Sequence, residues 1–227
     1  FKLWPAPDSV LAFAGWIRQH VPPEGRLAFA GSTDWKYEWG KPTYLPILAG
    51  REMMADDYYS YPKGLIEHNY PPKAYRQSLE TWIAFTRAYG ITHWAAADER
   101  HKGFLAAHPE WFECVRRMRM QSSRIEVYRV RGLPRPTRFL EGAGRVAARG
   151  NELVVRPEPA GAARVVIRYH WRDGLVCRTP GASIEPFVVD GHLQFIAVRP
   201  GGNPVVKIGY RPRPAPLKPN FDGSFHH

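Results

Sequence analysis

Aromatic and acidic side chains are concentrated in one part of the sequence, residues 32–72. Aromatic faces bind the C–H surfaces of sugars, and carboxylates and amides take the hydroxyl groups, so this composition predicts binding of a glycan or a lipid-linked sugar head group. The alternative is that the rings simply anchor a long loop to its domain. The candidate ligand-binding residues are Asp34, Trp35, Tyr37, Trp39, Asp56, Asp57, Tyr58, Tyr59, Glu67 and His68.

The same carboxylates could serve other chemistry. A glycosidase needs two carboxylates at a defined separation, but the neighbouring Asp56 and Asp57 point in different directions on an extended chain. A Ca²⁺ site could also be built from these two residues and backbone oxygens, although no EF-hand spacing is present. Both chemistries remain weaker alternatives to sugar binding.

A secondary candidate site consists of Asp98, Glu99 and His101, which follow a short apolar run at residues 91–97. Side chains that follow a buried strand often face the ligand in α/β folds. The alternative is that Asp98 caps the next helix through its carboxylate. The other histidines form no metal triad, and the sequence lacks phosphate-binding glycine loops and a G-x-S-x-G nucleophile motif. We therefore expect no metal and no cofactor, and we assign no catalytic residue.

The surrounding sequence predicts how these segments are positioned. Apolar residues at helical spacing predict helices at residues 8–20, 73–89 and 100–107. Short apolar runs predict strands at 26–31, 91–97, 111–118 and 125–130, and the alternation favours a small three-layer α/β domain over residues 1–132, with 32–72 as a long insertion. The proline-containing segment 132–136 is the predicted domain boundary.

The rest of the chain has a different pattern. Residues 137–213 contain seven short β-branched runs separated by Gly, Pro, Asn and Asp, which is typical of an antiparallel β-sandwich. Residues 214–227 form a proline-rich tail that ends in two histidines, as a tag remnant would. The expected fold class is thus α+β with two domains, an α/β domain followed by a β-sandwich.

Composition limits the possible partners. The net charge is +11, but the bases are scattered and form no zinc-finger, RNP-like or basic-heptad pattern, so we expect no nucleic acid partner. No apolar run approaches the roughly 18 residues that cross a bilayer. Cys114 and Cys177 fall in different predicted domains, which gives no metal site and leaves open whether they pair.

The order of these features resembles the extracytoplasmic C-terminal region of YfhO-like bacterial multi-spanning membrane proteins, which are related to the GT-C glycosyltransferases. The similar segments cover most of the chain: 45–51 (LPILAGR), 87–93 (RAYGITH), 112–115 (FECV), 125–130 (IEVYRV), 171–174 (WRDG), 189–191 (VDG), Phe195, 200–201 (PG) and 210–212 (YRP).

This resemblance implies that the chain is the extracytoplasmic part of a bacterial membrane protein that uses polyprenyl-phosphate-linked sugars. The catalytic carboxylate of such a transferase lies in an early loop between membrane helices, which this sequence does not contain, so the resemblance supplies no catalytic residue. We expect a module that is not catalytic alone and that assists binding of a glycan or lipid-linked sugar next to its parent transmembrane domain. The alternatives are a self-standing carbohydrate-active enzyme and a purely structural or protein-interaction module.

Overall fold

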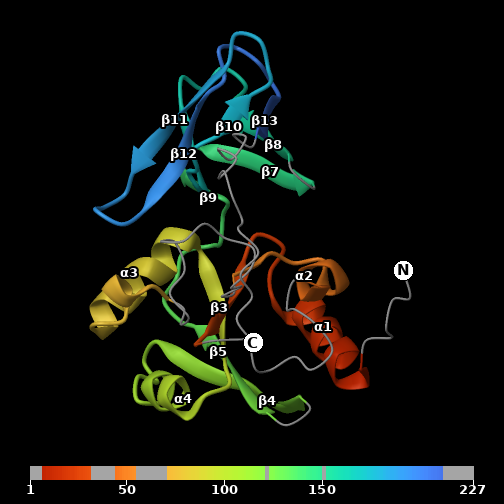
Figure 1. Cartoon of the computed structure of the whole chain (residues 1–227), viewed down its shortest axis with the longest axis vertical. Helices are drawn as coiled ribbons and strands as arrows, with labels where there is room; N and C mark the ends of the chain where they lie inside the picture. The colour runs from red at the N-terminus through yellow and green to blue at the C-terminus, as the bar shows by residue number, and fades with distance from the viewer. Residues whose placement is uncertain (1–6, 32–43, 55–70, 121–122, 150–151, 212–227) are drawn as a thin grey trace, which may run out of the picture. The chain divides into compact units, whose positions relative to one another are not determined.

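The chain folds as a mixed α/β protein with three sheets of four or five strands. A computed structural model describes residues 7–31, 44–54, 71–120, 123–149 and 152–211 (Figure 1). The chain divides into two compact units, Phe1–Leu140 and Glu141–His227. This division falls within the short strand β6 (Phe139–Glu141).

The first unit contains a five-stranded sheet in the order β2-β1-β3-β5-β4. Strands β2, β1 and β3 are parallel to one another, and β5 and β4 continue the sheet in antiparallel pairs. The strands span β1 (Arg26–Ala30), β2 (Met53–Met54), β3 (Ile91–Ala96), β4 (Phe112–Met120) and β5 (Ser123–Val130).

Helices cover both faces of this sheet, as Figure 1 shows for α1 and α2 on one side and α3 and α4 on the other. On the first face, Phe13 of α1 and Leu45 of α2 share an apolar core with Leu27, Phe29 and other inward residues of the strands. On the second face, Trp82 of α3 packs on Trp94 of β3, with ring centroids 4.9 Å apart. The helices are α1 (Asp8–His20), α2 (Tyr44–Ala49), α3 (Leu79–Tyr89) and α4 (Glu99–Ala106).

The structure differs from the sequence prediction in two places. Residues 32–72 contain the helix α2 and the strand β2, whereas the sequence predicts a long insertion there. The helix predicted over 73–89 is a 3₁₀ turn, η2 (Lys73–Tyr75), followed by α3, because Ser78 starts a new helix. Ser78 Oγ accepts the backbone N–H of Thr81 at 3.2 Å, and Thr81 Oγ1 accepts the backbone N–H of Ser78 at 3.1 Å.

This capping box gives a direct test of the α3 start. We expect Ser78→Ala to lower the free energy of unfolding by about 1 kcal/mol, because the first turn of α3 loses the acceptor for its Thr81 N–H group. Chemical denaturation followed by circular dichroism measures the change. Ser78→Asp, which keeps an acceptor at the N-cap, should retain most of the stability, and equal loss in both variants would contradict the capping role.

The second unit is built on two four-stranded sheets, with the strand orders β10-β13-β8-β7 and β11-β12-β9-β6, and the neighbouring strands among β7 to β13 pair in antiparallel fashion. All seven runs predicted from the sequence are strands. The sequence did not predict β6, because a strand of three residues is too short to form a recognisable pattern. The strands are β7 (Ala143–Arg149), β8 (Glu152–Glu158), β9 (Val165–His170), β10 (Leu175–Cys177), β11 (Ser183–Val188), β12 (Gln194–Arg199) and β13 (Val206–Tyr210).

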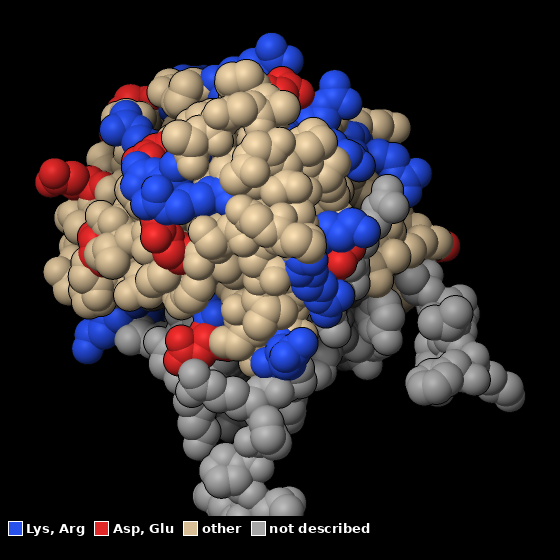
Figure 2. All heavy atoms as spheres, turned by 90° about the horizontal axis from the view of Figure 1, so that it is seen from above, with Lys and Arg blue, Asp and Glu red and all other residues tan. Residues whose placement is uncertain are grey.

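Charged side chains of both signs lie on the surface of the second unit. Figure 2 shows Lys and Arg spread over the visible face with Asp and Glu among them. Several of these charges are paired: Arg164 with Glu141 at 2.6 Å, and Arg199 with Glu185 at 2.9 Å. Exposed pairs of this kind contribute little to stability, because water screens them.

Candidate functional site at the carboxyl edge of the first sheet

The three parallel strands of the first unit bring distant parts of the chain to one edge. Strand β1 ends at Ala30, β2 at Met54 and β3 at Ala96. Ala30 lies opposite Ala96 in the register of β1 and β3, and Ala28 lies opposite Met54 in the register of β1 and β2. Because the strands run in the same direction, the segments that follow them start from the same edge of the sheet.

This edge contains a switch point between β1 and β3. After β1 the chain continues to α2 on one face of the sheet, and after β3 it continues to α4 on the opposite face (Figure 1). Two neighbouring strands whose connections leave in opposite directions form a crevice outside their carboxyl ends, where open α/β sheets bind ligands.

The main sequence-predicted site residues fall outside the described residues, because they lie in 32–43 and 55–70. The structure places the residues from which these segments depart: Gly31 directly after β1, and Met54 at the end of β2. Both segments therefore begin at the carboxyl edge, on strands that neighbour each other. The role of the aromatic and acidic residues in these segments stays a prediction.

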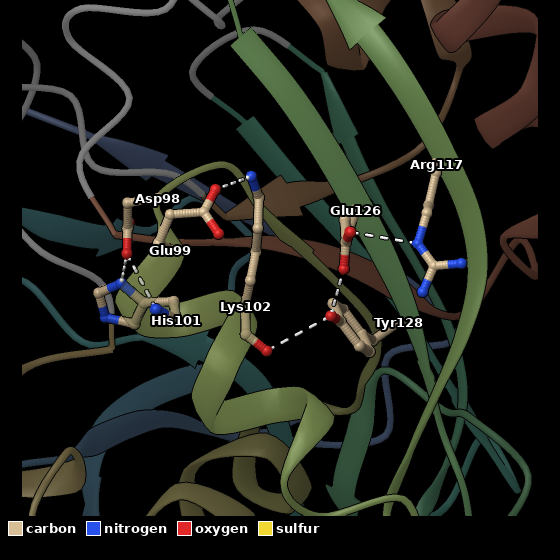
Figure 3. A network of polar contacts seen from close by, with 7 residues as sticks. All are labelled: Asp98, Glu99, His101, Lys102, Arg117, Glu126 and Tyr128. Atoms are coloured by element: carbon tan, nitrogen blue, oxygen red, sulfur yellow. Dashed lines mark hydrogen bonds and ion pairs between the residues drawn. The ribbon is translucent and has the colours of Figure 1, made fainter.

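The secondary candidates Asp98 and His101 form a hydrogen-bonded pair at the same edge (Figure 3). Asp98 is the N-cap of α4, and its Oδ1 accepts the backbone N–H of His101 at 2.9 Å. The same oxygen contacts the ring Nδ1 of His101 at 2.6 Å. The predicted capping role of Asp98 is therefore confirmed, and the cap also fixes the imidazole.

Gly31 makes room for this pair. Its φ of +86° lies in the left-handed region, and a Cβ built on it would overlap Asp98 Oδ2 and lie 3.0 Å from His101 Nδ1. A side chain at position 31 would therefore displace the carboxylate that holds His101. The end of β1 and the start of α4 thus fit together only with glycine at this position.

The ring of Trp82, from α3, lies next to His101 and also contacts Phe104 of α4. The ring centroids of Trp82 and His101 lie 5.9 Å apart, and those of Trp82 and Phe104 lie 4.7 Å apart. Trp82 is 2% exposed and its indole Nε1–H has no hydrogen-bond partner, although buried donors are nearly always paired. The site therefore combines an oriented imidazole with an apolar aromatic wall.

Glu99, the third secondary candidate, is not part of this pair. Its carboxylate binds Lys102 Nζ at 2.8 Å, and its side chain is 91% exposed (Figure 3). The structure thus brings together two of the three secondary candidates, and it directs Glu99 toward the neighbouring lysine.

A second polar network, which we did not expect from the sequence, lies beneath α4. Tyr128 donates its hydroxyl proton to Glu126 at 2.6 Å, and Arg117 donates to the same carboxylate at 3.1 Å (Figure 3). Burial raises the pKa of Glu126, but these hydrogen bonds outweigh that effect and hold its pKa below the usual value. Burial and the bond to Glu126 raise the pKa of Tyr128, so the phenol stays protonated. This network supports α4 on the sheet.

Within the described part of the chain, no three His, Cys, Asp or Glu side chains gather in a way that could hold a metal ion. The thiols of Cys114 and Cys177 are both free, and burial raises the pKa of the Cys114 thiol. No helix within the described ranges is long and apolar enough to span a membrane.

Comparison of the chain with protein-family models, with curated proteins and with solved structures finds no match.

Proposed function

We propose that this chain is a carbohydrate-binding module whose site is the carboxyl edge of the first sheet, around the switch point between β1 and β3. One observation carries the proposal: the parallel strands start both aromatic-rich segments and the Asp98–His101 pair from a single edge. Three stretches of sequence whose residue types suit sugar binding thus start from one edge of the sheet.

The residue types in the segments that start from this edge suit a sugar. Segments 32–43 and 55–70 supply Trp35, Trp39 and Tyr59 for stacking on sugar faces, and Asp34 and Asp57 as acceptors for hydroxyl groups. Asp98 and His101 add a fixed polar group where β3 ends. We propose that the chain binds and orients its ligand and does not transform it, because the described part of the site pairs an acid with a base but offers no oriented nucleophile beside them.

The wider setting follows from the sequence resemblance. We propose that the module is the extracytoplasmic part of a bacterial GT-C-type membrane protein, and that its ligand is an acceptor glycan or a polyprenyl-phosphate-linked sugar. The positive charge of the chain is compatible with this location, because long domains are translocated largely regardless of their charge.

We propose a structural role, and no ligand-binding role, for the second unit. We infer that its two sheets pack as a β-sandwich, because each sheet carries fully buried apolar residues: Val155 and Ile208 in one, and Ile167 and Phe195 in the other. With the α/β unit before it, the chain then has a two-domain α+β fold.

Calorimetric titration with a panel of bacterial oligosaccharides tests the proposal. We expect binding, and we expect Trp35→Ala and Trp39→Ala to weaken it by about tenfold each, which equals roughly 1.4 kcal/mol. The control is Tyr210→Ala, which removes a partly exposed ring from β13 in the second unit and should not change the affinity. Failure of the whole panel to bind would contradict the proposed function, and turnover of a sugar by the chain alone would favour the enzyme alternative.

A further inference from the structure

We infer that Nε2 of the neutral His101 imidazole is an oriented hydrogen-bond acceptor that receives a free hydroxyl group of the ligand. This inference rests on the proposed function, and it goes further because it assigns one ligand group to one atom. It also predicts which sugars the site rejects.

The first step is the tautomer of His101. Ionised Asp98 can only accept hydrogen bonds, so the 2.6 Å contact between its Oδ1 and His101 Nδ1 requires the proton to be on Nδ1. A neutral imidazole carries one proton, which leaves the lone pair on Nε2 free to accept. Asp98 is itself held by the N–H group that it caps, so the tautomer is fixed by the start of α4.

The second step is that this acceptor has no partner in the protein. No hydrogen bond joins Nε2 to any other residue that the structure describes, although the His101 side chain is more than nine-tenths buried. Nε2 itself is not closed off from solvent, unlike Trp82 Nε1, so a small donor from outside the protein can reach its lone pair. Figure 3 shows the second ring nitrogen directed away from Asp98.

The third step is the kind of group that fits. The ring is flanked by Trp82 on one side, and Gly31 beside the Asp98–His101 pair carries no side chain. Glu99 and Lys102 of the same helix bind each other. A small neutral donor, such as a sugar hydroxyl, can then donate to Nε2 beside the Trp82 ring.

This geometry makes the site selective for a free hydroxyl. Methylation of that hydroxyl removes its proton, and the ether oxygen then faces the lone pair of Nε2. We expect the O-methyl derivative of a bound sugar to bind about 10- to 100-fold more weakly than the free sugar, because the ether offers Nε2 no proton and keeps water away from it.

The matched variant is His101→Phe. It keeps an aromatic ring beside Trp82 but removes Nε2, and Asp98 can still accept the backbone N–H of residue 101, so α4 stays capped. The variant should therefore bind the free sugar and its methyl ether about equally. The control is Glu99→Gln, an acid-to-amide change on the exposed side of α4.

Two measurements test the inference. Nitrogen-15 spectra of the histidine side chains, recorded above neutral pH on the free protein, should show a histidine protonated at Nδ1 in the wild type, and this signal should be missing in His101→Phe. Titration of a bound sugar and its singly O-methylated derivatives should show strong discrimination at one position in the wild type and in Glu99→Gln, and none at that position in His101→Phe.

The outcomes separate this inference from the proposed function. Protonated Nε2 in the wild type would overturn the inference whether or not a sugar binds. Sugar binding with the same discrimination in wild type and His101→Phe would also overturn it, while the proposed function would stand. Failure of every sugar to bind would overturn the proposed function together with the hydroxyl assignment.

Discussion

Glu52→Ala is expected to lower the free energy of unfolding by about 3 kcal/mol. Glu52 accepts a hydrogen bond from Arg26 Nε at 2.9 Å, and it lies 3.1 Å from Arg138 Nη1. Both arginine side chains are almost completely buried, at 4% and 5% exposure. Removal of the carboxylate leaves the two buried guanidinium groups without this counter-ion. An uncompensated buried charge is strongly destabilising. The partial exposure of Glu52 places the effect at the lower end of the range for such changes.

Urea unfolding followed by tryptophan fluorescence measures this effect, since Trp82 and Trp94 lie in the core of the same unit. The control is Glu24→Ala, which removes a half-exposed carboxylate 3.6 Å from Arg138 Nε and should cost less than about 1 kcal/mol. Equal losses in the two variants would contradict the role assigned to Glu52. Because Arg26 starts β1, this cluster lies at the amino edge of the sheet, and we expect Glu52→Ala to bind sugar normally while it is folded.

Acid is expected to destabilise the first unit through His93. Burial, with smaller contributions from Arg129 and His20, lowers the pKa of His93 to about 4 from the usual 6.5. Between these two values the unfolded chain binds a proton that the folded protein does not, so the stability is present above pH 6.5 and is lost as the pH falls toward 4. At pH 4 the loss from this residue amounts to about 3 kcal/mol.

A pair of variants isolates this contribution from that of the carboxylates, which also titrate in acid. We expect His93→Gln to be less stable than the wild type at pH 7 and to show a flatter dependence of the unfolding free energy on pH between 6.5 and 4. The control is His192→Gln, at an exposed position, which should keep the wild-type dependence. An unchanged slope in His93→Gln would contradict the assignment to His93.

The sequence predicts the elements whose side chains form a clear pattern. Helix α1 has its apolar residues at helical spacing, and β1 and β3 are continuous buried runs, so their bounds agree closely with the prediction. Strand β2 escaped the prediction because it consists of two residues whose place is set by backbone pairing with β1. The break before α3 is visible in the sequence only as Ser78 and Thr81, three residues apart within a continuous apolar pattern.

The same distinction holds for the site. The Asp98–His101 pair could be found from the sequence because it joins two residues of one helical turn after a buried strand. Other features of the site depend on how β1, α3 and α4 pack together, and the local sequence does not indicate this packing. They are the tautomer of His101, the close approach of Gly31 to Asp98 and the contact of His101 with Trp82. The cluster of Glu52, Arg26 and Arg138 likewise joins residues that are distant in the sequence.

The most direct test of the carboxyl-edge site is a map of backbone amide shifts upon addition of a sugar that binds in the titrations. The shifts should change at Gly31, at the residues that follow β3 from Ala97 to His101, and in segments 32–43 and 55–70. They should stay unchanged at the amino edge of the sheet, around Glu24 and Glu52, and in the second unit. Changes confined to the second unit or to the amino edge would contradict the site proposed here.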